Sequence, residues 1–323
     1  MKLSIGIKAL NEEADIAAAI ESALAAAEPF AGEVVLADSG STDRTIEIAR
    51  SYPVRIVQLA NIGERCCGAG AQLAWQAAQG EYFYLLDGDM TLADGFMAEA
   101  VAYLDAHANV AGVGGMVIEQ NVRGQDFRIR AQKAREFSGY VDRLDCGGLY
   151  RMSAICEIGY FADRNLHAFE EFDLGARLAA SGWVLARIGR PGVFHNGHAS
   201  GGYRLLWRRL RTGYSGGAGE VVRAALGKPH LGIVLRRLRQ LHVGLVVVAW
   251  WLALLGCMLG AKFAALIALL LLPLLLLALR RRSVSLALYS LAAWNVATVG
   301  LIGGLFRRRK DPSIPVSAVS IPK

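Results

Sequence analysis

The first third of the chain alternates short apolar runs with amphipathic helical segments, and this order constrains the fold more than any other feature. Four runs have the length and composition of buried strands, at residues 3–7, 33–38, 54–59 and 82–86. Helical patterns separate them, at residues 12–26, 44–51 and 69–79. A β-α-β order predicts an α/β fold with a mainly parallel central sheet flanked by helices. Such sheets bind ligands beyond the carboxyl ends of their strands.

The last third has a different character, because it contains three long stretches without charge. These are residues 243–261, 263–279 and 283–306, and a helix needs about 20 apolar residues to cross a bilayer. Basic residues cluster before the first stretch and after the second and third, whereas only Lys262 lies between the first two. The positive-inside rule therefore predicts a hairpin over 243–279. The third stretch either does not cross fully or breaks that rule, and both possibilities stay open.

Together these patterns divide the chain into four parts. With 54% hydrophobic and 20% charged residues it is not a disordered chain. The predicted parts are a folded cytoplasmic domain at 1–202, a basic amphipathic connector at the membrane surface at 203–240, membrane helices at 241–306 and a basic tail at 307–323.

Charge and cysteine usage narrow the class of protein further. The net charge is +7, and the cations crowd the part of the chain from Arg204 onward. They flank apolar stretches, which favours an anionic membrane over nucleic acid as the partner. The five cysteines include no CxxC pair, which argues against a disulfide framework or a zinc site and for a reducing compartment. The segment 1–13 does not resemble a signal peptide, so we expect this domain on the cytoplasmic side of the inner membrane.

Acidic residues follow several of the predicted strands. Asp87 and Asp89, separated by one glycine, follow the apolar run YFYLL at 82–86. Asp38 ends the second strand, and the small, turn-forming residues SGSTD follow it at 39–43. Glu12 follows the first strand within KALNEE. Two carboxylates around a glycine suit Mg²⁺ or Mn²⁺, which keep positions open for substrate phosphates. A DxD pair alone also occurs in solvated turns. Here, however, three strands each change from apolar to acidic residues at the same edge of the sheet, which favours a binding site.

In combination these motifs resemble the family 2 glycosyltransferases, over roughly residues 3–225. KALNEE (8–13) resembles the nucleotide loop after the first strand, and ADSGSTD (37–43) resembles the V-D-D-G-S-T-D signature. QGEYFYLLDGDM resembles the approach to the metal-binding DxD, and FEEFDLGARLAASGW (169–183) resembles the segment that holds the catalytic base. The order of catalytic domain, basic connector and apolar segments is similar to that of membrane-attached bacterial exopolysaccharide glycosyltransferases. The resemblance implies a GT-A-like fold, with 1–202 as the glycosyltransferase domain.

The resemblance also implies roles for individual residues. Residues expected to bind the donor nucleotide-sugar are Ala9, Asn11, Glu12, Asp38, Arg65, Asp87 and Gly88. Residues expected to bind a metal ion are Asp89, Asp87 and His195, with His198 a weaker candidate.

The remaining implied roles concern the reaction and the acceptor. Glu171 stands where the family has a catalytic aspartate, and Glu170 is its rival. Gly147 and Gly148 are expected beside the acceptor. Asp173 is expected on the acceptor side as well, or paired with Arg177 at the i+4 position. Asp43 is a candidate helix cap.

These roles imply inverting, metal-dependent hexosyl transfer with Mg²⁺ or Mn²⁺ as cofactor. The donor is expected to be a UDP-sugar, with a GDP-sugar as the second possibility. The acceptor is expected to be a polyprenyl-diphosphate-linked saccharide in polysaccharide biosynthesis. The alternative is a polyprenyl-phosphate sugar synthase that resembles dolichol-phosphate mannose synthase, and a non-enzymatic membrane scaffold is a distant one. No Q-x-x-R-W motif of a processive synthase and no G-x-G-T-R loop of a nucleotidyltransferase is present.

Overall fold

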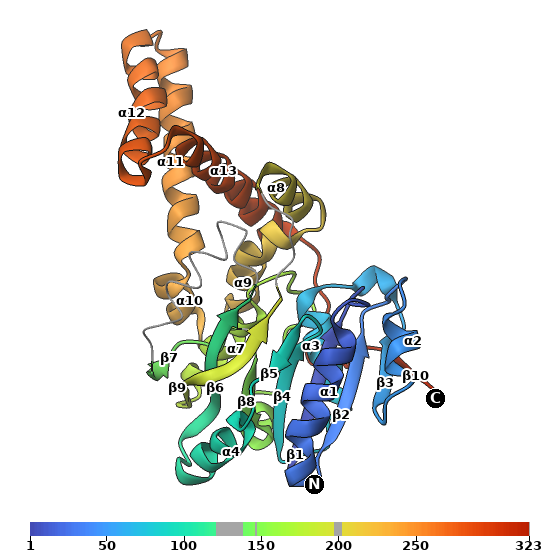
Figure 1. The fold of residues 1–323 in the computed structure, drawn as a ribbon. Helices are drawn as coiled ribbons and strands as arrows, with labels where there is room; N and C mark the ends of the chain where they lie inside the picture. Colours follow the sequence, from blue (N-terminus) through green and yellow to red (C-terminus); the bar gives the residue numbers. More distant parts are fainter. Residues whose placement is uncertain (121–137, 146, 197–201, 323) are drawn as a thin grey trace. The chain divides into compact units, whose positions relative to one another are not determined.

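The computed structural model describes residues 1–120, 138–145, 147–196 and 202–322. The chain forms two compact units (Figure 1). The first comprises Met1–Ala199 together with Arg309–Lys323, and the second comprises Ser200–Arg308. Cys146 and His198 lie outside the described residues.

The first unit is built on one mixed sheet with the strand order β10-β3-β2-β1-β4-β8-β6-β9-β5. Its parallel half confirms the α/β prediction and consists of β1 (Leu3–Ala9), β2 (Glu33–Asp38), β3 (Arg55–Leu59) and β4 (Tyr82–Asp87). The other half is mixed: β8 (Gly148–Arg151) runs antiparallel to β4 and to β6 (Val110–Glu119), and β9 (Val184–His195) runs parallel to β6. The short strands β5 (Met90–Leu92) and β7 (Gly139–Val141) pair antiparallel with β9.

Helices cover both faces of this sheet, as the apolar character of both faces of its central strands requires. The helices of this unit are α1 (Ile16–Ala27), α2 (Thr45–Ala49), α3 (Cys67–Ala77), α4 (Phe96–Ala106), α6 (Met152–Glu157) and α7 (Glu170–Ala180). Single 3-10 turns are η1 (Glu28–Phe30) and η2 (Ile62–Glu64).

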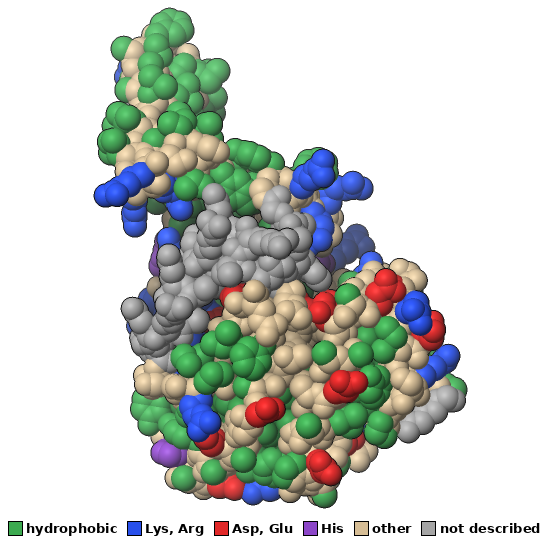
Figure 2. Space-filling view, in the orientation of Figure 1, with side chains coloured by type: hydrophobic (Ala, Val, Ile, Leu, Met, Phe, Trp, Pro, Cys, Tyr) green, Lys and Arg blue, Asp and Glu red, His purple; other side chains and the backbone are tan. Residues whose placement is uncertain are grey.

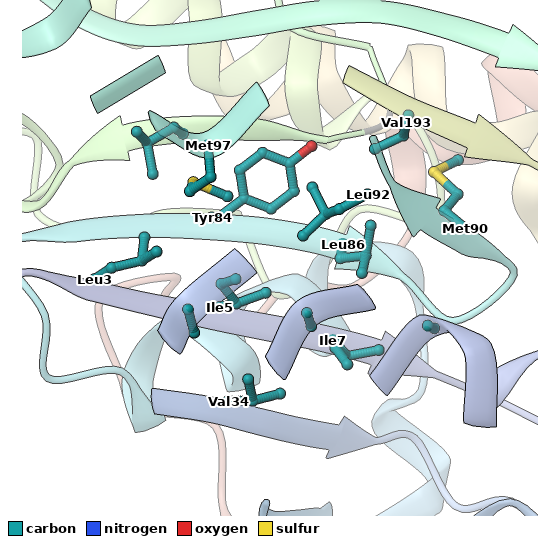
Figure 3. Close-up of a cluster of buried hydrophobic side chains, with 14 of the residues drawn as sticks. Leu3, Ile5, Ile7, Val34, Tyr84, Leu86, Met90, Leu92, Met97 and Val193 are labelled. Atoms are coloured by element: carbon teal, nitrogen blue, oxygen red, sulfur yellow. The ribbon is translucent and has the colours of Figure 1, made fainter. Parts of the chain in front are cut away.

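Alternation along the strands divides the core into two clusters. Ile5 and Ile7 of β1 point to one face with Tyr84 and Leu86 of β4, where α1 and α4 cover them (Figure 3). The alternate positions of β4, Phe83 and Leu85, belong to the cluster on the opposite face, with residues of α3, α6 and α7. The period of two along each strand thus explains why these runs are apolar at every position.

The helix that the sequence pattern predicts from Glu12 begins later, at Ile16. The backbone N–H of Glu12 donates to Thr45 Oγ1 at 2.8 Å, and that of Glu13 donates to Asp43 Oδ2 at 3.0 Å. These hydrogen bonds hold residues 12 and 13 in a loop that contacts residues 43–45, so the helix starts one turn further on.

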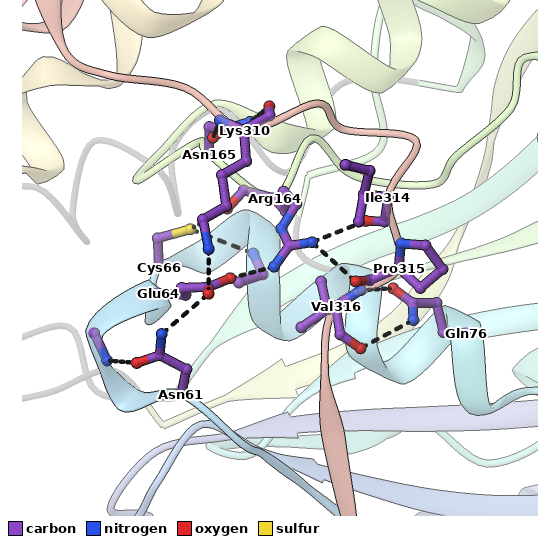
Figure 4. A network of polar contacts seen from close by, with 12 residues as sticks. Asn61, Glu64, Cys66, Gln76, Arg164, Asn165, Lys310, Ile314, Pro315 and Val316 are labelled. Carbon is purple, nitrogen blue, oxygen red and sulfur yellow. Dashed lines mark hydrogen bonds and ion pairs between the residues drawn. The ribbon is translucent and has the colours of Figure 1, made fainter.

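The C-terminal tail adds a strand that the sequence pattern does not predict. β10 (Ala318–Ile321) pairs antiparallel with β3 at the edge of the sheet. Just before it, Val316 is buried in the second core cluster, and its backbone N–H and carbonyl both bond to the side-chain amide of Gln76 in α3 (Figure 4). The tail is therefore a structural part of the first unit.

The second unit is helical. Its short helices are α8 (Gly202–Arg211), η3 (Tyr214–Gly216), α9 (Gly217–Ala225) and α10 (Leu231–Arg237). Its long helices are α11 (Arg239–Leu259), α12 (Phe263–Arg281) and α13 (Val284–Phe306), and each is long and apolar enough to cross a membrane. Hydrophobic side chains cover the surface of α11 and α12 (Figure 2). These three helices coincide with the three predicted apolar stretches and indicate membrane association.

Candidate active site

The parallel register brings the ends of three strands to one edge of the sheet. Ala9 of β1 lies opposite Asp38 of β2, and Lys8 lies opposite Asp87 of β4. Three of the predicted donor residues therefore lie at the same edge. Gly88 follows directly, with its N–H bonded to the Lys8 carbonyl at 3.0 Å.

Two loops at this edge are joined by hydrogen bonds. Asn11 adopts a left-handed backbone with φ of 57°, a conformation that asparagine tolerates better than most residues. Its side-chain Oδ1 accepts from the Thr42 N–H at 2.8 Å, and its own N–H donates to Ser41 Oγ at 2.9 Å. The loop after β1 is thereby fixed to the loop after β2.

Asp38 shapes the second of these loops from within. Its carboxylate is buried and accepts from the N–H groups of Gly40 and Ser41 at 2.8 and 2.9 Å, and from Gln58 Nε2 at 2.8 Å. Further along, Asp43 accepts from the Thr45 N–H at 3.0 Å, where α2 begins. The Asp38 carboxylate thus holds the loop in its shape, and its predicted contact with the nucleotide base stays a prediction.

Glu12 and Gly88 lie against each other. A Cβ on Gly88 would be 2.9 Å from Glu12 Cγ and 3.3 Å from Ala9 Cβ, so only glycine fits there without displacing a neighbour. Burial, and then the neighbouring Asp89 carboxylate, raise the pKa of Glu12 to about 8. The carboxylates at this edge are therefore crowded enough to favour a bound cation.

Lys8 already supplies one cation to this edge. Its Nζ lies 3.2 Å from Asp87 Oδ1 and 3.1 Å from Glu170 Oε1. Burial opposes the charge of Lys8, but Asp87, Glu170 and Glu171 outweigh it and raise its pKa above the ordinary value. Sequence reasoning missed this residue, although a lysine inside an apolar strand is a signal, because a buried charge needs a partner.

Glu170 and Glu171 open α7 beside the end of β4. They line one pocket with Asp87 and with both predicted acceptor-side glycines. The other residues that line it are Leu85, Leu144, Tyr150, Phe161, Ala162 and Leu174. Burial, and then the neighbouring Glu170, raise the pKa of Glu171 to about 8. The structure thus brings the candidate base and its rival together with the DxD segment.

The two glycines give this pocket its space. Gly147 has φ of +101°, and a Cβ there would be 2.7 Å from the Tyr84 hydroxyl. A Cβ on Gly148 would be 2.6 Å from Leu144 Cδ1. Larger side chains at these two positions would displace the pocket's walls.

Asp173 is not brought to the pocket. Its side chain is fully buried, and its Oδ2 lies 2.7 Å from Arg177 Nε, one turn along α7. Arg177 in turn donates to the carbonyls of Tyr160 and Phe161 at 2.7 and 2.6 Å. Of the two predicted roles, the structure shows the ion pair, which holds the loop that leads into the pocket wall.

Asp89 and His195 lie side by side, with His195 Nε2 3.2 Å from Asp89 Oδ2. The other imidazole nitrogen, Nδ1, lies 2.7 Å from Oε2 of the buried Glu119 at the end of β6. Burial opposes protonation of His195, but both carboxylates outweigh it and raise its pKa to about 9. Sequence reasoning missed Glu119, although an acid at a strand end is the signal that identified the others.

The side chains of Asp89 and His195 offer donor atoms that suit a metal ion. A carboxylate and an imidazole converge, and a second carboxylate orients the imidazole from behind, as is common at metal sites. Asp87 is engaged with Lys8 instead. Within the described ranges, no group of three or more His, Cys, Asp or Glu side chains is arranged to hold a metal. Asp89 and His195 would therefore supply two positions, and substrate or water the rest.

Arg65 is exposed in the loop between η2 and α3, on the carboxyl side of β3. The glycines that follow permit close packing, because a Cβ on Gly68 would collide with the Asp163 carbonyl. Glu64 pairs with Arg164 and with Lys310 of the tail, and Arg164 donates to the Ile314 and Pro315 carbonyls at 2.9 Å (Figure 4). The tail thus helps to fix the loop that carries Arg65.

A parallel half-sheet with carboxylates gathered at its edge, extended by a mixed half, defines a GT-A-like fold. Among solved structures, the chain is similar to a mannosyltransferase from Pyrobaculum calidifontis in complex with GDP-Man and Mn²⁺, with a TM-score of 0.65 and 18% identity over 94% of this chain and 87% of that one. It is also similar to residues 1–349 of TarS from S. aureus in complex with UDP-GlcNAc, with a TM-score of 0.53 and 18% identity over 95% and 93%. It spans 39% of the longer TarS chain.

Residues 4–159 match the family described as Glycosyl transferase family 2. Residues 4–159 therefore form a domain that matches the family 2 glycosyltransferases. No curated protein matches the chain.

Proposed function

We propose that the protein transfers a hexose, with inversion, from a nucleotide-diphosphosugar to an acceptor presented at a membrane. One observation carries this proposal: Asp87, Glu170 and Glu171 line a single pocket beyond the carboxyl end of β4. In an α/β sheet this is where a ligand binds. The family match and the nucleotide-sugar complexes of both similar structures support the same assignment.

Glu171 is the general base in this proposal. Glu170 is buried and paired with Lys8, whereas Glu171 is half-buried and reachable. The Glu171 carboxylate accepts the proton of the acceptor hydroxyl. The hydroxyl oxygen forms its bond to the anomeric carbon as the bond from that carbon to the diphosphate oxygen breaks. Attack from the opposite face inverts the configuration, and the reaction needs no covalent sugar-enzyme intermediate.

Asp89 and His195 would hold Mg²⁺ or Mn²⁺, with Asp87 beside them. Such an ion, when bound, neutralises charge on the leaving diphosphate. The Mn²⁺ in the mannosyltransferase complex supports a metal here. Glu119 positions His195 through Nδ1, which leaves Nε2 directed toward Asp89.

The donor would lie over the loops after β1 and β2, with Arg65 near its diphosphate. We favour a UDP-sugar, as the family resemblance implies, and keep a GDP-sugar as the second possibility. The two similar structures hold one of each. The three apolar helices support an acceptor in the membrane, either a polyprenyl-diphosphate-linked saccharide or, given the arginines of α8, a polyprenyl phosphate. The catalytic unit would face the cytoplasm at the inner membrane.

Isothermal titration of the detergent-solubilised protein with UDP and with GDP, each with and without Mn²⁺, tests this proposal. We expect one nucleotide to bind in a Mn²⁺-dependent manner and Asp89→Ala to abolish that dependence. Asp94→Ala is the matched control, because Asp94 is exposed and lies five positions further on. Absence of binding by either nucleotide, in protein shown to be folded, would refute the assignment of this site.

A further inference from the structure

The tail sets a condition on how the chain passes through the membrane. The chain leaves the first unit after Ala199 and returns to it at Arg309. Because β10 is hydrogen-bonded to β3 in the same sheet, the tail must be on the same side of the membrane as the catalytic unit. The number of crossings between these two points must therefore be even. The three candidate helices cannot all cross.

The surroundings of α13 identify it as the helix that does not cross. Along one side it packs on α8, η3 and α9, and elsewhere it contacts α11 and α12. Tyr203 of α8 stacks edge-on with Tyr289, at 5.5 Å between ring centroids, and Glu220 of α9 pairs with Arg307 at the other end. These contacts span 18 residues, or about 27 Å of helix, which is close to the thickness of the hydrocarbon core.

A crossing α13 would therefore carry its neighbours through the bilayer. α8 contains four arginines within ten residues, Arg204, Arg208, Arg209 and Arg211. Charged side chains at the centre of a bilayer are costly and are rarely found there without a functional reason. An α13 that lies in the plane of the membrane keeps α8 and α9 at the headgroup level.

The two faces of α13 fit such a position. Val284, Leu288, Val299, Ile302 and Phe306 are exposed, and their spacings of 4, 11, 3 and 4 place them in one stripe. Gly300 and Gly304 lie on the buried side, where a Cβ would collide with the backbone of Ser215 or Gly216. One face thus packs on α8, η3 and α9. The other presents apolar side chains at its two ends, and between them Asn295 accepts a hydrogen bond from Trp251 of α11 at 2.8 Å.

The distribution of charge agrees with two crossings by α11 and α12. Between these helices lies only Lys262, whereas Arg280, Arg281 and Arg282 follow α12. Further basic clusters precede α11 and follow α13. An in-plane α13 places every basic cluster on the side of the catalytic unit, as the positive-inside rule requires. It also places the arginines where they meet anionic headgroups.

We propose that the chain crosses the bilayer twice, through the α11–α12 hairpin, and that α13 lies along the membrane surface on the catalytic side with its stripe in the lipid. This surface does not depend on the proposed reaction.

Protease-cleavable epitopes test this arrangement in the full-length protein. One epitope precedes Met1, one follows Lys323, and one is inserted between Gly260 and Ala261, each in a separate variant. Protease is added to sealed inside-out and right-side-out vesicles. We expect both terminal epitopes to be cleaved from one side and the hairpin epitope from the other. Cleavage of the C-terminal epitope from the side opposite to the N-terminal one would show an odd number of crossings and overturn the proposal. Cleavage of all three from one side would overturn it as well.

A pair of substitutions tests α13 directly. Val299→Arg places a charge in the exposed stripe, and Leu272→Arg places one on an exposed position at the middle of α12. We expect Leu272→Arg to lower the amount of membrane-inserted protein several-fold and Val299→Arg to leave it within twofold of the parent, since an arginine on an in-plane helix reaches the headgroups. An equal loss in the two variants would overturn the in-plane position.

Discussion

At the scale of single residues, the candidate site gathers three carboxylates, those of Asp87, Glu170 and Glu171, near the ammonium group of Lys8. Asp87 and Glu170 both contact Lys8, and Glu171 lies next to them in the same pocket. Because the pKa of Glu171 is raised to about 8, this carboxyl group is mostly protonated at neutral pH. It can act as a base only as the pH rises. We therefore expect the free enzyme to show an acidic limb, which is a fall in kcat/KM as the pH drops below the pKa of Glu171.

We predict that kcat/KM increases with pH up to about 8, in contrast to the ordinary glutamate pKa of about 4.3. Glu171→Gln should lower kcat by about 10²–10⁴-fold and leave nucleotide binding intact, because it removes only the proton acceptor. Glu170→Gln is the matched control at the neighbouring position and should cost less. A pH–rate profile with single-turnover assays measures this, and a larger loss in Glu170→Gln would assign the base to Glu170 instead.

Lys8→Met should shift the pH dependence of kcat/KM. Since Lys8 lowers the pKa of Glu171, its removal should move the acidic limb to higher pH. It should also lower stability by about 1–3 kcal/mol, between the values for exposed and buried ion pairs. Lys2→Met is the control, because Lys2 forms an exposed pair with Asp105. Thermal unfolding and the pH profile measure the two effects, and an unshifted limb would contradict this role of Lys8.

At the scale of elements, close backbone approach decides how α9 packs on α13. Gly219 faces the Leu301 carbonyl, and Gly304 faces the Gly216 carbonyl, so neither can hold a Cβ without displacement. Small residues that allow helices to approach this closely are common at membrane helix contacts. The neighbouring Gly303 is exposed, with open space around its Cβ position.

Gly304→Ala should therefore separate α9 from α13, whereas Gly303→Ala should not. We expect Gly304→Ala to lower the apparent Tm of the detergent-solubilised protein by several degrees, with a loss of about 1–3 kcal/mol from overpacking. Gly303→Ala should leave it unchanged or raise it slightly, because alanine favours helix. Equal Tm values for the two variants would show that this contact does not matter for stability.

At the scale of the whole molecule, the first unit, which carries the proposed active site, is assembled from two separate segments of the chain, residues 1–199 and 309–323. Residues 1–199 lack β10, the buried Val316 and the Ile314 and Pro315 carbonyls that accept from Arg164. A fragment that ends at residue 199 therefore exposes the edge of β3, which is a site for non-native pairing.

We predict that joining residues 309–323 to this fragment, through a Gly/Ser linker of about 20 residues that spans about 25 Å, raises its Tm over that of 1–199 alone. Val316→Asp in the joined tail should abolish the gain, because Val316 is buried, and Val319→Asp should keep most of it, because Val319 is 54% exposed. Thermal unfolding of the four proteins measures this. A joined tail without effect would show that β10 contributes no stability.

Much of this protein could be predicted from the sequence, because the relevant signals are local. Continuous apolar runs separated by helical patterns predicted the parallel strands, and acids at strand ends placed Asp38 and Asp87 at the same edge. Charge-free stretches located α11, α12 and α13 within a few residues. Glycosyltransferase motifs identified the family, and the pair of Asp173 with Arg177 follows from helical spacing.

Long-range contacts were decided only by the tertiary structure. Lys8 meets Glu170 across 162 positions of sequence, and His195 meets Glu119 across 76, so no local pattern links them. The strand in the tail is four residues long, and it forms because β3 offers an open edge. The number of membrane crossings has the same origin: each apolar stretch by itself is long enough to cross, and pairing between β10 and β3 limits how many can.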